Sequence, residues 1–257
     1  MAEKEPILIP VESLDKDPFR GLISYPNPSV ESVRTRLDQL RNLGITRLEF
    51  KGHLKMGNLS ILGKGVVGLV FAGYMGENPV AVKIRRVDSR RATMTHEAAM
   101  MKAANHAGIG PEYLGATHDA LSMKFVEGRA LPAWISEMKG RGRRSRVRSV
   151  FKSLFKQCVK LDSYGLDHGE LSRAHKNVIV TDSDTPWILD FESASLNRRV
   201  NNFTSIAQYL FLSGTFARRV QRVLGPIERD ELVKYLRLYK SGRTNEAFEA
   251  VEKMLRL

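Results

Sequence analysis

The sequence predicts an α+β fold with a β-rich first part and a mostly helical second part. Short runs of β-branched and aromatic residues, separated by glycine-bearing turns, dominate residues 54–85. Apolar residues at helical spacing dominate the chain from residue 147 onward. Strands gathered in one part of a chain and helices in another are typical of the α+β class.

Residues 1–50 are expected to form an N-terminal extension that consists of an arm, a helix and a strand. Prolines punctuate residues 1–28 and predict an extended arm. Ser29 can cap a helix that runs to Leu43, because the apolar positions follow helical spacing and Gly44 stops it. Residues 45–50 then have the composition of a strand.

Residues 51–126 are expected to form the β-rich part. The tracts LSILGKG, VVGLVFAGY and NPVAVKI predict strands separated by turns. A helix is expected over residues 92–106, and two more strands are expected over 113–115 and 120–126. The turn at Glu127-Gly128 leads out of this part.

Residues 127–257 are expected to be mostly helical. One apolar stripe of a helix contains Val147, Phe151, Leu154, Cys158 and Leu161. Two short strands, 177–180 and 187–189, flank the turn TDSDTP. Further helices are expected near residues 204–212, 216–223, 227–239 and 244–256.

The composition limits the partners and the compartment. The chain has 41 Lys and Arg against 28 Asp and Glu, a formal net charge of +13. This charge predicts attraction to nucleic acid, nucleotide phosphates or an acidic protein, although a basic surface can also serve solubility alone. The single cysteine, Cys158, excludes an intramolecular disulfide and, with no secretory leader in view, indicates the cytoplasm. The uncharged stretch 203–217 is too short for a membrane span, so we expect a buried helix and no membrane partner.

A glycine-rich sequence at residues 63–70, GKGVVGLV, has the pattern GxGxxGxV. Glycines let a hairpin approach phosphate oxygens and point backbone N–H groups at them. A Rossmann loop would need a helix that begins inside the motif, whereas the β-rich tract VVGLVF follows here. The motif therefore predicts a phosphate-binding hairpin, with a glycine-rich turn of purely structural role as the alternative.

Lys83 lies inside the apolar strand sequence VAVKI. A lysine in such a strand is costly unless it is paired or bound to an anion. It follows the glycine-rich sequence by one hairpin, which suits contact with the α- and β-phosphates of a nucleotide. Glu97, on the next predicted helix, is the expected partner of Lys83, and an exposed helix carboxylate is the alternative.

Candidate metal and acceptor residues follow in the second part. Asp190 ends the apolar strand sequence WILD, where a carboxylate can hold Mg²⁺ that bridges phosphates. Glu170, in the sequence HGEL, supplies a carboxylate near a phosphate acceptor, and Asn177 supplies an amide for the metal.

The order of these motifs resembles that of the protein kinases. The tracts HGELSRAHKNVIV, ILDFESAS and NNFTSIAQYLF resemble an archaeal set of predicted serine/threonine kinases, related to the RIO kinases and to the kinase subunit of the KEOPS tRNA-modification complex. The resemblance covers about residues 57–215. It implies a bilobal protein-kinase-like fold, with an N-lobe over 51–126, a minimal C-lobe over 127–257 and a nucleotide in the cleft between them.

The resemblance also implies a role for each motif residue. Glu170 would take the place of the catalytic aspartate and act with Asp190 and Lys83. Asn177 and Asp190 would hold Mg²⁺. The residues implied to bind ATP are Gly63, Lys64, Gly65, Gly68, Val70, Ala81, Lys83, Glu97, Met123, Lys124 and Val126.

Several departures from the kinase pattern bear on these roles. Glu170 stands where the family usually has Asp, Gly169 replaces the arginine of HRD, and Glu192 is the third residue of the DFG motif. The usual spacing would select His175 as the metal ligand, but we prefer Asn177 because it directly precedes a predicted strand. The chain has no APE sequence after the DF motif, which favours the minimal group and leaves peptide-substrate recognition open.

The most basic segment, residues 138–161, has nine Lys or Arg and no Asp or Glu. Its residues at four-residue spacing, here called the basic ridge, are Arg144, Arg148, Lys152, Lys156 and Lys160. Like charges at this spacing destabilise a helix unless a polyanion or a neighbouring acid offsets them. Contact with RNA phosphates is one interpretation of the ridge, and a solvated face is the other.

The leading hypothesis is an ATP- and Mg²⁺-dependent phosphotransferase that acts on Ser or Thr of a protein or on itself. One alternative is a nucleotide-binding switch, either a pseudokinase or a slow ATPase, with an RNA or ribosome-linked partner. Another is a small-molecule kinase, because a kinase-like fold alone does not fix the acceptor.

Overall fold

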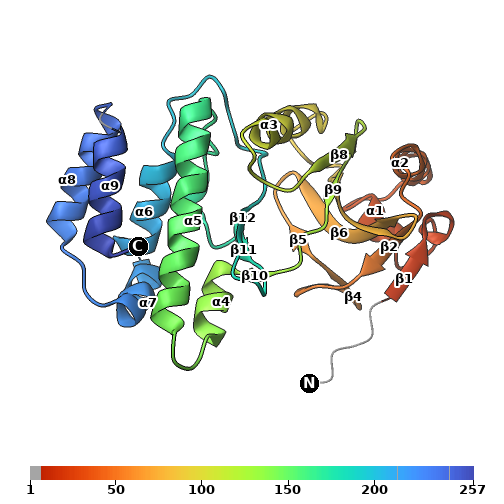
Figure 1. Ribbon diagram of the computed structural model, residues 1–257. Coiled ribbons are helices and arrows are strands. Elements are labelled where there is room, and N and C mark those ends of the chain that lie inside the picture. Colours follow the sequence, from red (N-terminus) through yellow and green to blue (C-terminus); the bar gives the residue numbers. More distant parts are fainter. Residues whose placement is uncertain (1–6, 213, 243) are drawn as a thin grey trace. The chain divides into compact units, whose positions relative to one another are not determined.

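The computed structural model describes residues 7–212, 214–242 and 244–257, and these residues form an α+β protein with two compact units (Figure 1). Unit 1 contains the described part of Met1–Lys102 together with Pro111–Val126. Unit 2 contains Ala103–Gly110 together with the described part of Glu127–Leu257. The predicted α+β class is confirmed, and the kinase-like architecture remains a prediction.

An antiparallel sheet forms the centre of unit 1. Its order is β1-β2-β6-β7-β9-β8, and β5 pairs with β6. The strands are β1 (Ile7–Pro10), β2 (Arg47–Phe50), β5 (Gly63–Lys64), β6 (Gly68–Met75), β7 (Asn78–Arg85), β8 (Tyr113–Ala116) and β9 (Ala120–Lys124). A separate hairpin contains β3 (Leu54–Met56) and β4 (Leu59–Ile61). β6 and β7 form the longest hairpin: β-branched and aromatic residues favour both strands, and Gly76, at φ 61°, allows the tight turn between them.

The N-terminal extension is part of this sheet, so the predicted extended arm over residues 1–28 is wrong for the residues that the structure describes. β1 pairs with β2 along its whole length. A 3₁₀ turn, η1 (Val11–Ser13), and a short helix, α1 (Arg20–Ile23), follow. These elements bury Val11, Leu14, Leu22 and Ile23 in the core of unit 1. Charged residues and prolines separate the apolar ones, so no periodicity indicated these elements.

Helix α2 (Val30–Asn42) agrees with the prediction. The hydroxyl of Ser29 accepts a 3.1 Å hydrogen bond from the backbone N–H of Ser32. The hydroxyl of Ser32 accepts a 3.0 Å bond from the backbone N–H of Ser29, which completes a capping box. The helix ends before Gly44, which has φ 74°.

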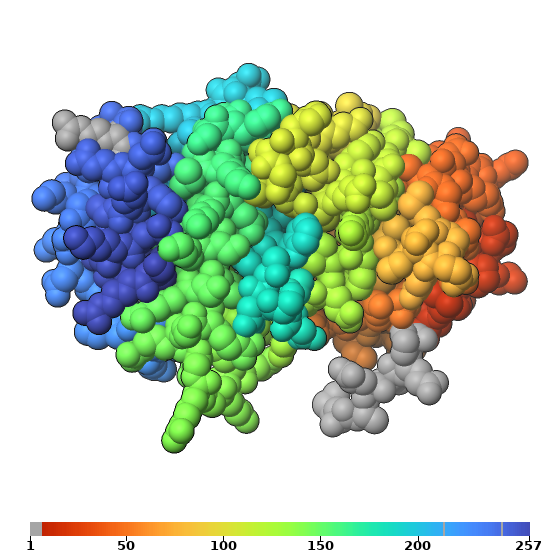
Figure 2. All heavy atoms as spheres, in the orientation of Figure 1, coloured from red at the N-terminus to blue at the C-terminus, as the bar shows by residue number. Residues whose placement is uncertain are grey.

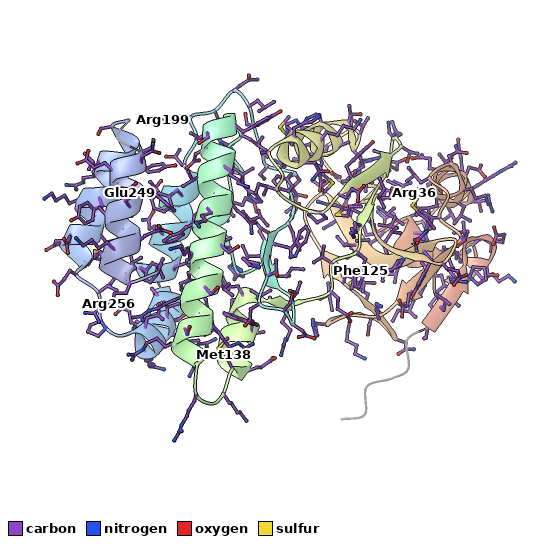
Figure 3. The ribbon with its side chains drawn as sticks, in the orientation of Figure 1. Arg36, Phe125, Met138, Arg199, Glu249 and Arg256 are labelled. Atoms are coloured by element: carbon purple, nitrogen blue, oxygen red, sulfur yellow. The ribbon has the colours of Figure 1, made fainter. Side chains whose placement is uncertain are left out.

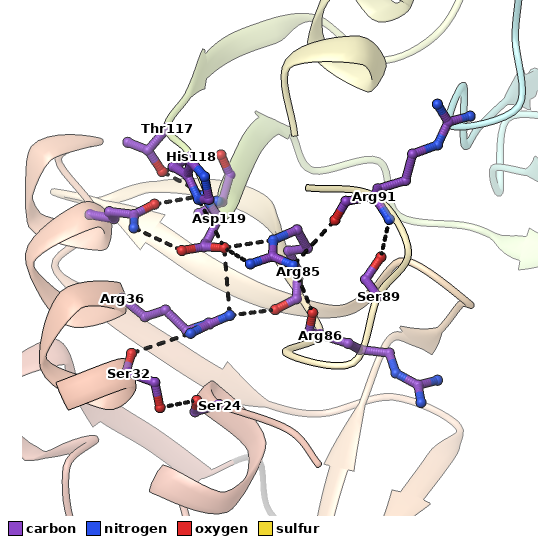
Figure 4. A network of polar contacts seen from close by, with 12 residues as sticks. Ser24, Ser32, Arg36, Arg85, Arg86, Ser89, Arg91, Thr117, His118 and Asp119 are labelled. Carbon is purple, nitrogen blue, oxygen red and sulfur yellow. Dashed lines mark hydrogen bonds and ion pairs between the residues drawn. The ribbon is translucent and has the colours of Figure 1, made fainter. Parts of the chain in front are cut away.

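A polar network that contains Arg36 ties α2 to the sheet (Figure 4), and Figure 3 marks Arg36 itself. Arg36 is only 4% exposed, and its guanidinium lies 3.5 Å from the carboxylate of Asp119. Arg85 lies 2.6 Å from the same carboxylate, and Gln39 donates a 3.0 Å bond to it. Burial alone would raise the pKa of Asp119, but the bond from Gln39 and the charges of Arg36 and Arg85 outweigh burial and lower it.

Helix α3 (Thr95–His106) begins in unit 1 and ends in unit 2. The other helices of unit 2 are α4 (Leu131–Glu137), α5 (Arg143–Tyr164), α6 (Asn202–Phe211), α7 (Gly214–Leu224), α8 (Arg229–Lys240) and α9 (Thr244–Leu255). α5 to α9 agree with the predicted helices to within a few residues, whereas α4 was not predicted. A small sheet contains β10 (Arg129–Ala130), β11 (Val178–Val180) and β12 (Pro186–Ile188).

The core of unit 2 lies between α5 and α6. The rings of Phe155 and Phe203 meet at a centroid distance of 5.0 Å, and those of Phe151 and Phe211 at 5.7 Å. α6, which covers most of the first part of the uncharged stretch 203–217, is buried as expected. Within the described ranges, no helix is both long and apolar enough to cross a bilayer.

Candidate functional site

The glycine-rich sequence forms a hairpin between β5 and β6, as predicted. Gly63 pairs with Val70 and Lys64 pairs with Leu69. The backbone N–H of Gly65 donates a 2.8 Å bond to the carbonyl of Gly68 and closes the tip. A Cβ on Gly68 would lie 2.7 Å from the carbonyl oxygen of Ile84, so β7 leaves no room for a side chain there.

Lys83 and Glu97 form the expected ion pair. Lys83 Nζ lies 2.9 Å from Glu97 Oε1, and the side chains are 3% and 4% exposed. The strand β7 places Lys83 opposite Val70 of the glycine-rich hairpin. Unit 1 therefore holds an ammonium group at a fixed position next to a glycine-rich hairpin in which Gly68 has no room for a side chain.

The other predicted nucleotide-binding residues of unit 1 lie on β7, on β9 and just beyond β9. Ala81 and Met123 are both buried and occupy opposite positions in the β7–β9 pair. Lys124 is exposed, and its backbone N–H donates a 2.9 Å bond to the carbonyl of Glu112. That backbone N–H is therefore already engaged, and its use in binding a nucleotide would require this bond to open. Val126 is the last residue of unit 1 and is half-buried.

In unit 2, His168 is a buried neutral residue that organises the loop after α5. Its Nε2 lies 2.9 Å from the carbonyl oxygen of Leu189, which can only accept, so Nε2 carries the proton. The backbone N–H of Glu170 points at Nδ1 from 3.4 Å. Burial lowers the pKa of His168 below its ordinary value, in agreement with a neutral ring.

Glu170 and Asn177 lie together in unit 2. Asn177 is buried, and its side-chain amide donates to Glu170 Oε2 over 3.4 Å. Ser193, which no motif in the sequence indicates, donates a 2.7 Å bond to Glu170 Oε1. His175, the alternative to Asn177, is exposed, and its ring stacks on Tyr209 at 6.5 Å. The structure therefore brings Asn177 rather than His175 to Glu170.

Asp190 follows β12 in a backbone conformation that is rare for residues other than glycine, with φ 65°. A carboxylate oxygen of Asp190 lies within 4.8 Å of one from Glu192. Carboxylate and amide oxygens are the hard donors that Mg²⁺ prefers, so Asp190, Glu192 and Asn177 fit such an ion chemically.

A buried hub that the sequence did not predict fixes this loop on the helices of unit 2. Asn202 Oδ1 accepts a 2.8 Å bond from the backbone N–H of His168, and its amide donates to the carbonyl of Leu166 and to Asp162. Asp162 also accepts a 2.9 Å bond from the hydroxyl of Tyr239. Forty residues separate Asp162 from Asn202, and polar residues carry no periodic signal, so only an alignment of related sequences could have marked the pair.

The basic ridge lies on α5, and its members differ in their surroundings. Arg144 donates a 3.1 Å bond to the carbonyl of Val223 on α7. Lys152 Nζ lies 3.5 Å from Glu252 on α9. Lys156 and Lys160 are exposed, whereas Arg148 is half-buried. The segment that leads into α5, in green, projects from the surface of unit 2 (Figure 2).

The fold and these clusters define an α+β protein with a buried lysine–glutamate pair in one unit and a group of carboxylates in the other. No family model matches the chain. The chain is similar to the Uncharacterized protein MJ1211 of Methanocaldococcus jannaschii, with 28% identity over 115 residues, or 45% of this chain and 92% of that protein.

Proposed function

We propose that this chain is an ATP- and Mg²⁺-dependent phosphotransferase of the serine/threonine protein kinase type. The observation that carries the proposal is the buried pair of Lys83 and Glu97, with 2.9 Å between Nζ and Oε1. Two apolar residues of similar volume would stabilise the core at least as well as a buried ion pair does. A role in binding an anion accounts for the pair better than stability does.

The arrangement of the glycine-rich hairpin supports a nucleotide as the anion. Strand β6 of the hairpin pairs with β7, the strand that carries Lys83. The close approach of Gly68 to β7 requires glycine at position 68. Backbone N–H groups of such a hairpin bind phosphate oxygens, and the ammonium group of Lys83 adds a point charge to them. The proposal assigns the triphosphate to Gly63, Gly65, Gly68 and Lys83.

Unit 2 supplies the residues that the proposal assigns to metal binding and to the acceptor. Asp190 and Asn177 would hold Mg²⁺, which neutralises charge on the phosphates when it is bound. Glu170 would orient the acceptor hydroxyl and take its proton. Because the bonds from Ser193 and Asn177 fix Glu170, its extra methylene relative to aspartate need not leave the carboxylate mobile.

Transfer of labelled γ-phosphate from ATP, with and without cell extract, tests the proposal. Asp190→Asn should abolish Mg²⁺-dependent transfer, and Glu170→Gln should lower it by about 10²–10⁴-fold. Asp182→Asn, an exposed acid in the turn between β11 and β12, is the matched control and should transfer phosphate normally. Equal transfer by Asp190→Asn and by the unmodified protein would contradict the assignment.

A further inference from the structure

The side chain of Ser193 is in the position of an acceptor hydroxyl. Its Oγ donates a 2.7 Å hydrogen bond to Glu170 Oε1. Ser193 lies three residues after Asp190, in a turn that the backbone N–H of Ala194 closes by bonding to the carbonyl of Phe191 at 3.1 Å. The residue is half-buried, so the turn presents the hydroxyl without enclosing it fully.

Glu170 is oriented toward Ser193 from its other side. The amide of Asn177 holds Oε2, and the backbone N–H of Glu170 faces the buried ring of His168. A hydroxyl, a base within hydrogen-bond reach and a third group that orients the base together form the arrangement of an activated nucleophile. All three side chains belong to unit 2, so the arrangement is intramolecular.

We propose that Ser193 is itself a phosphate acceptor, and that the chain transfers the γ-phosphoryl group of a nucleoside triphosphate to its own Ser193. This inference rests on the proposed phosphotransferase function and names its first substrate. Ser193 Oγ forms a bond to the γ-phosphorus, and the bond from that phosphorus to the β–γ bridging oxygen breaks. The nucleoside diphosphate leaves with the electron pair of that bond, and the hydroxyl proton passes to Glu170 Oε1.

The surroundings of Ser193 also suit the product. Arg198 Nη2 donates a 2.9 Å bond to the carbonyl of Ser193, and Arg198 Nε lies 2.6 Å from Asp167. Phosphoserine carries a charge of about −1.5 to −2, which a guanidinium can pair with and the carboxylate of Glu170 repels. Phosphorylation would therefore move the side chain from Glu170 toward Arg198 and leave Glu170 open to another acceptor.

The competing explanation is that Ser193 only positions Glu170. In that case Ser193 would never carry phosphate, and its loss would slow transfer to other acceptors. The two explanations predict different products, so the site of the phosphate decides between them.

The experiment incubates the full chain with Mg²⁺ and ATP and locates phosphate by peptide mass spectrometry. Ser193 should be phosphorylated in the unmodified protein, Ser193→Thr should carry the phosphate on threonine, and Glu170→Gln should react about 10²–10⁴-fold more slowly. Ser195→Ala is the matched control, because Ser195 lies in the same loop and its hydroxyl accepts a 3.1 Å bond from Asn197. Ser195→Ala should be phosphorylated at Ser193 as fast as the unmodified protein. For the unmodified protein, the fraction of chains phosphorylated per minute should not change on tenfold dilution.

Binding of a fluorescent ATP analogue, measured in parallel, distinguishes a failure of phosphorylation at Ser193 from a failure of nucleotide binding. In one outcome the chain binds the analogue and transfers phosphate to other residues, to another protein or to water, with none on Ser193. That result would overturn the inference and leave the proposed function standing. A rate that falls on dilution would overturn the intramolecular step. Absence of both nucleotide binding and phosphate transfer would overturn the inference and the proposed function together.

Discussion

The hydroxyl of Tyr25 accepts a 2.7 Å hydrogen bond from Nζ of Lys64 and so joins the N-terminal segment to the glycine-rich hairpin. The same Nζ lies 4.4 Å from the centroid of the Tyr25 ring, and the guanidinium of Arg86 lies 5.3 Å from it. Arg86 also donates a 3.3 Å bond to the carbonyl of Gly65. The N-terminal segment therefore restrains the part of the hairpin that the proposal assigns to phosphate.

Tyr25→Phe should loosen the hairpin without unfolding unit 1, because it removes the hydroxyl and keeps the ring. One such hydrogen bond contributes about 0.5–1.5 kcal/mol, so we expect nucleotide affinity to fall by up to about tenfold. Hydrogen exchange of the amides of residues 65–68 should become faster. Tyr74→Phe is the matched control, since it removes a 3.1 Å bond to Glu49 away from the hairpin. Equal exchange at residues 65–68 in the two variants would contradict this restraint.

Asp119→Asn should be strongly destabilising because it leaves Arg36 buried without its counter-charge. Removing one partner of a buried ion pair costs about 3–5 kcal/mol, whereas Asp38→Asn, at an exposed pair with Arg41, should cost less than about 1 kcal/mol. Urea unfolding measures both. Similar costs for the two substitutions would show that the network of Arg36 contributes little.

The same carboxylate predicts a pH dependence. The pKa of Asp119 is lowered in the folded protein, so its contribution to stability is present above the pKa of the unfolded chain, about 3.9. That contribution is lost as the pH falls through the lower, folded value. The difference in unfolding free energy between the unmodified protein and Asp119→Asn should therefore be constant near neutral pH and shrink below about pH 4. A constant difference down to the acid transition would contradict the lowered pKa.

Contact of the basic ridge with RNA remains a prediction. Lys156 and Lys160 are the members to test, because both are exposed. Replacing Lys156 and Lys160 by Gln should reduce the slope of log affinity against log salt by about 0.7–0.9 for each lost phosphate contact. Replacing Arg34 and Arg41, on α2, by Gln is the control, because it removes the same number of positive charges elsewhere on the surface. An unchanged slope, or no retention of RNA by the unmodified protein at about 50 mM salt, would return the ridge to a solvated face.

Local signals in the sequence were enough for most helices and for the hairpins of unit 1. The cap at Ser29, the periodicity of α5 and the glycines of the β5–β6 hairpin depend on residues close together in the chain. The pairing of β1 with β2 was missed, because it joins strands nearly 40 residues apart and β1 has no periodic pattern long enough to mark it.

In the candidate site, too, the contacts with a local sequence signal were predictable and the contacts between distant residues were not. Lys83 and Glu97 were predictable, because a lysine in an apolar strand requires a partner and the next helix offered one carboxylate at a suitable place. The bond of Ser193 to Glu170 was not predictable, because 23 residues separate them and serine is common in turns. The hydrogen bond from the backbone N–H of Lys124 to Glu112 was not predictable either, because a local motif does not encode how β9 pairs with the residues before β8.

Calorimetric titration of Mg-ATP into the unmodified protein and into Lys83→Ala measures directly whether Lys83 binds the nucleotide. Lys55→Ala, at an exposed lysine of β3, is the control, and Lys83→Met/Glu97→Leu removes the pair without leaving a buried charge. A contact to a charged group contributes about 1.5–3 kcal/mol, so Lys83→Ala and the double variant should bind about tenfold to a hundredfold more weakly. Lys55→Ala should bind as the unmodified protein does. Equal affinity of all four proteins, or no binding by the unmodified protein, would contradict the account.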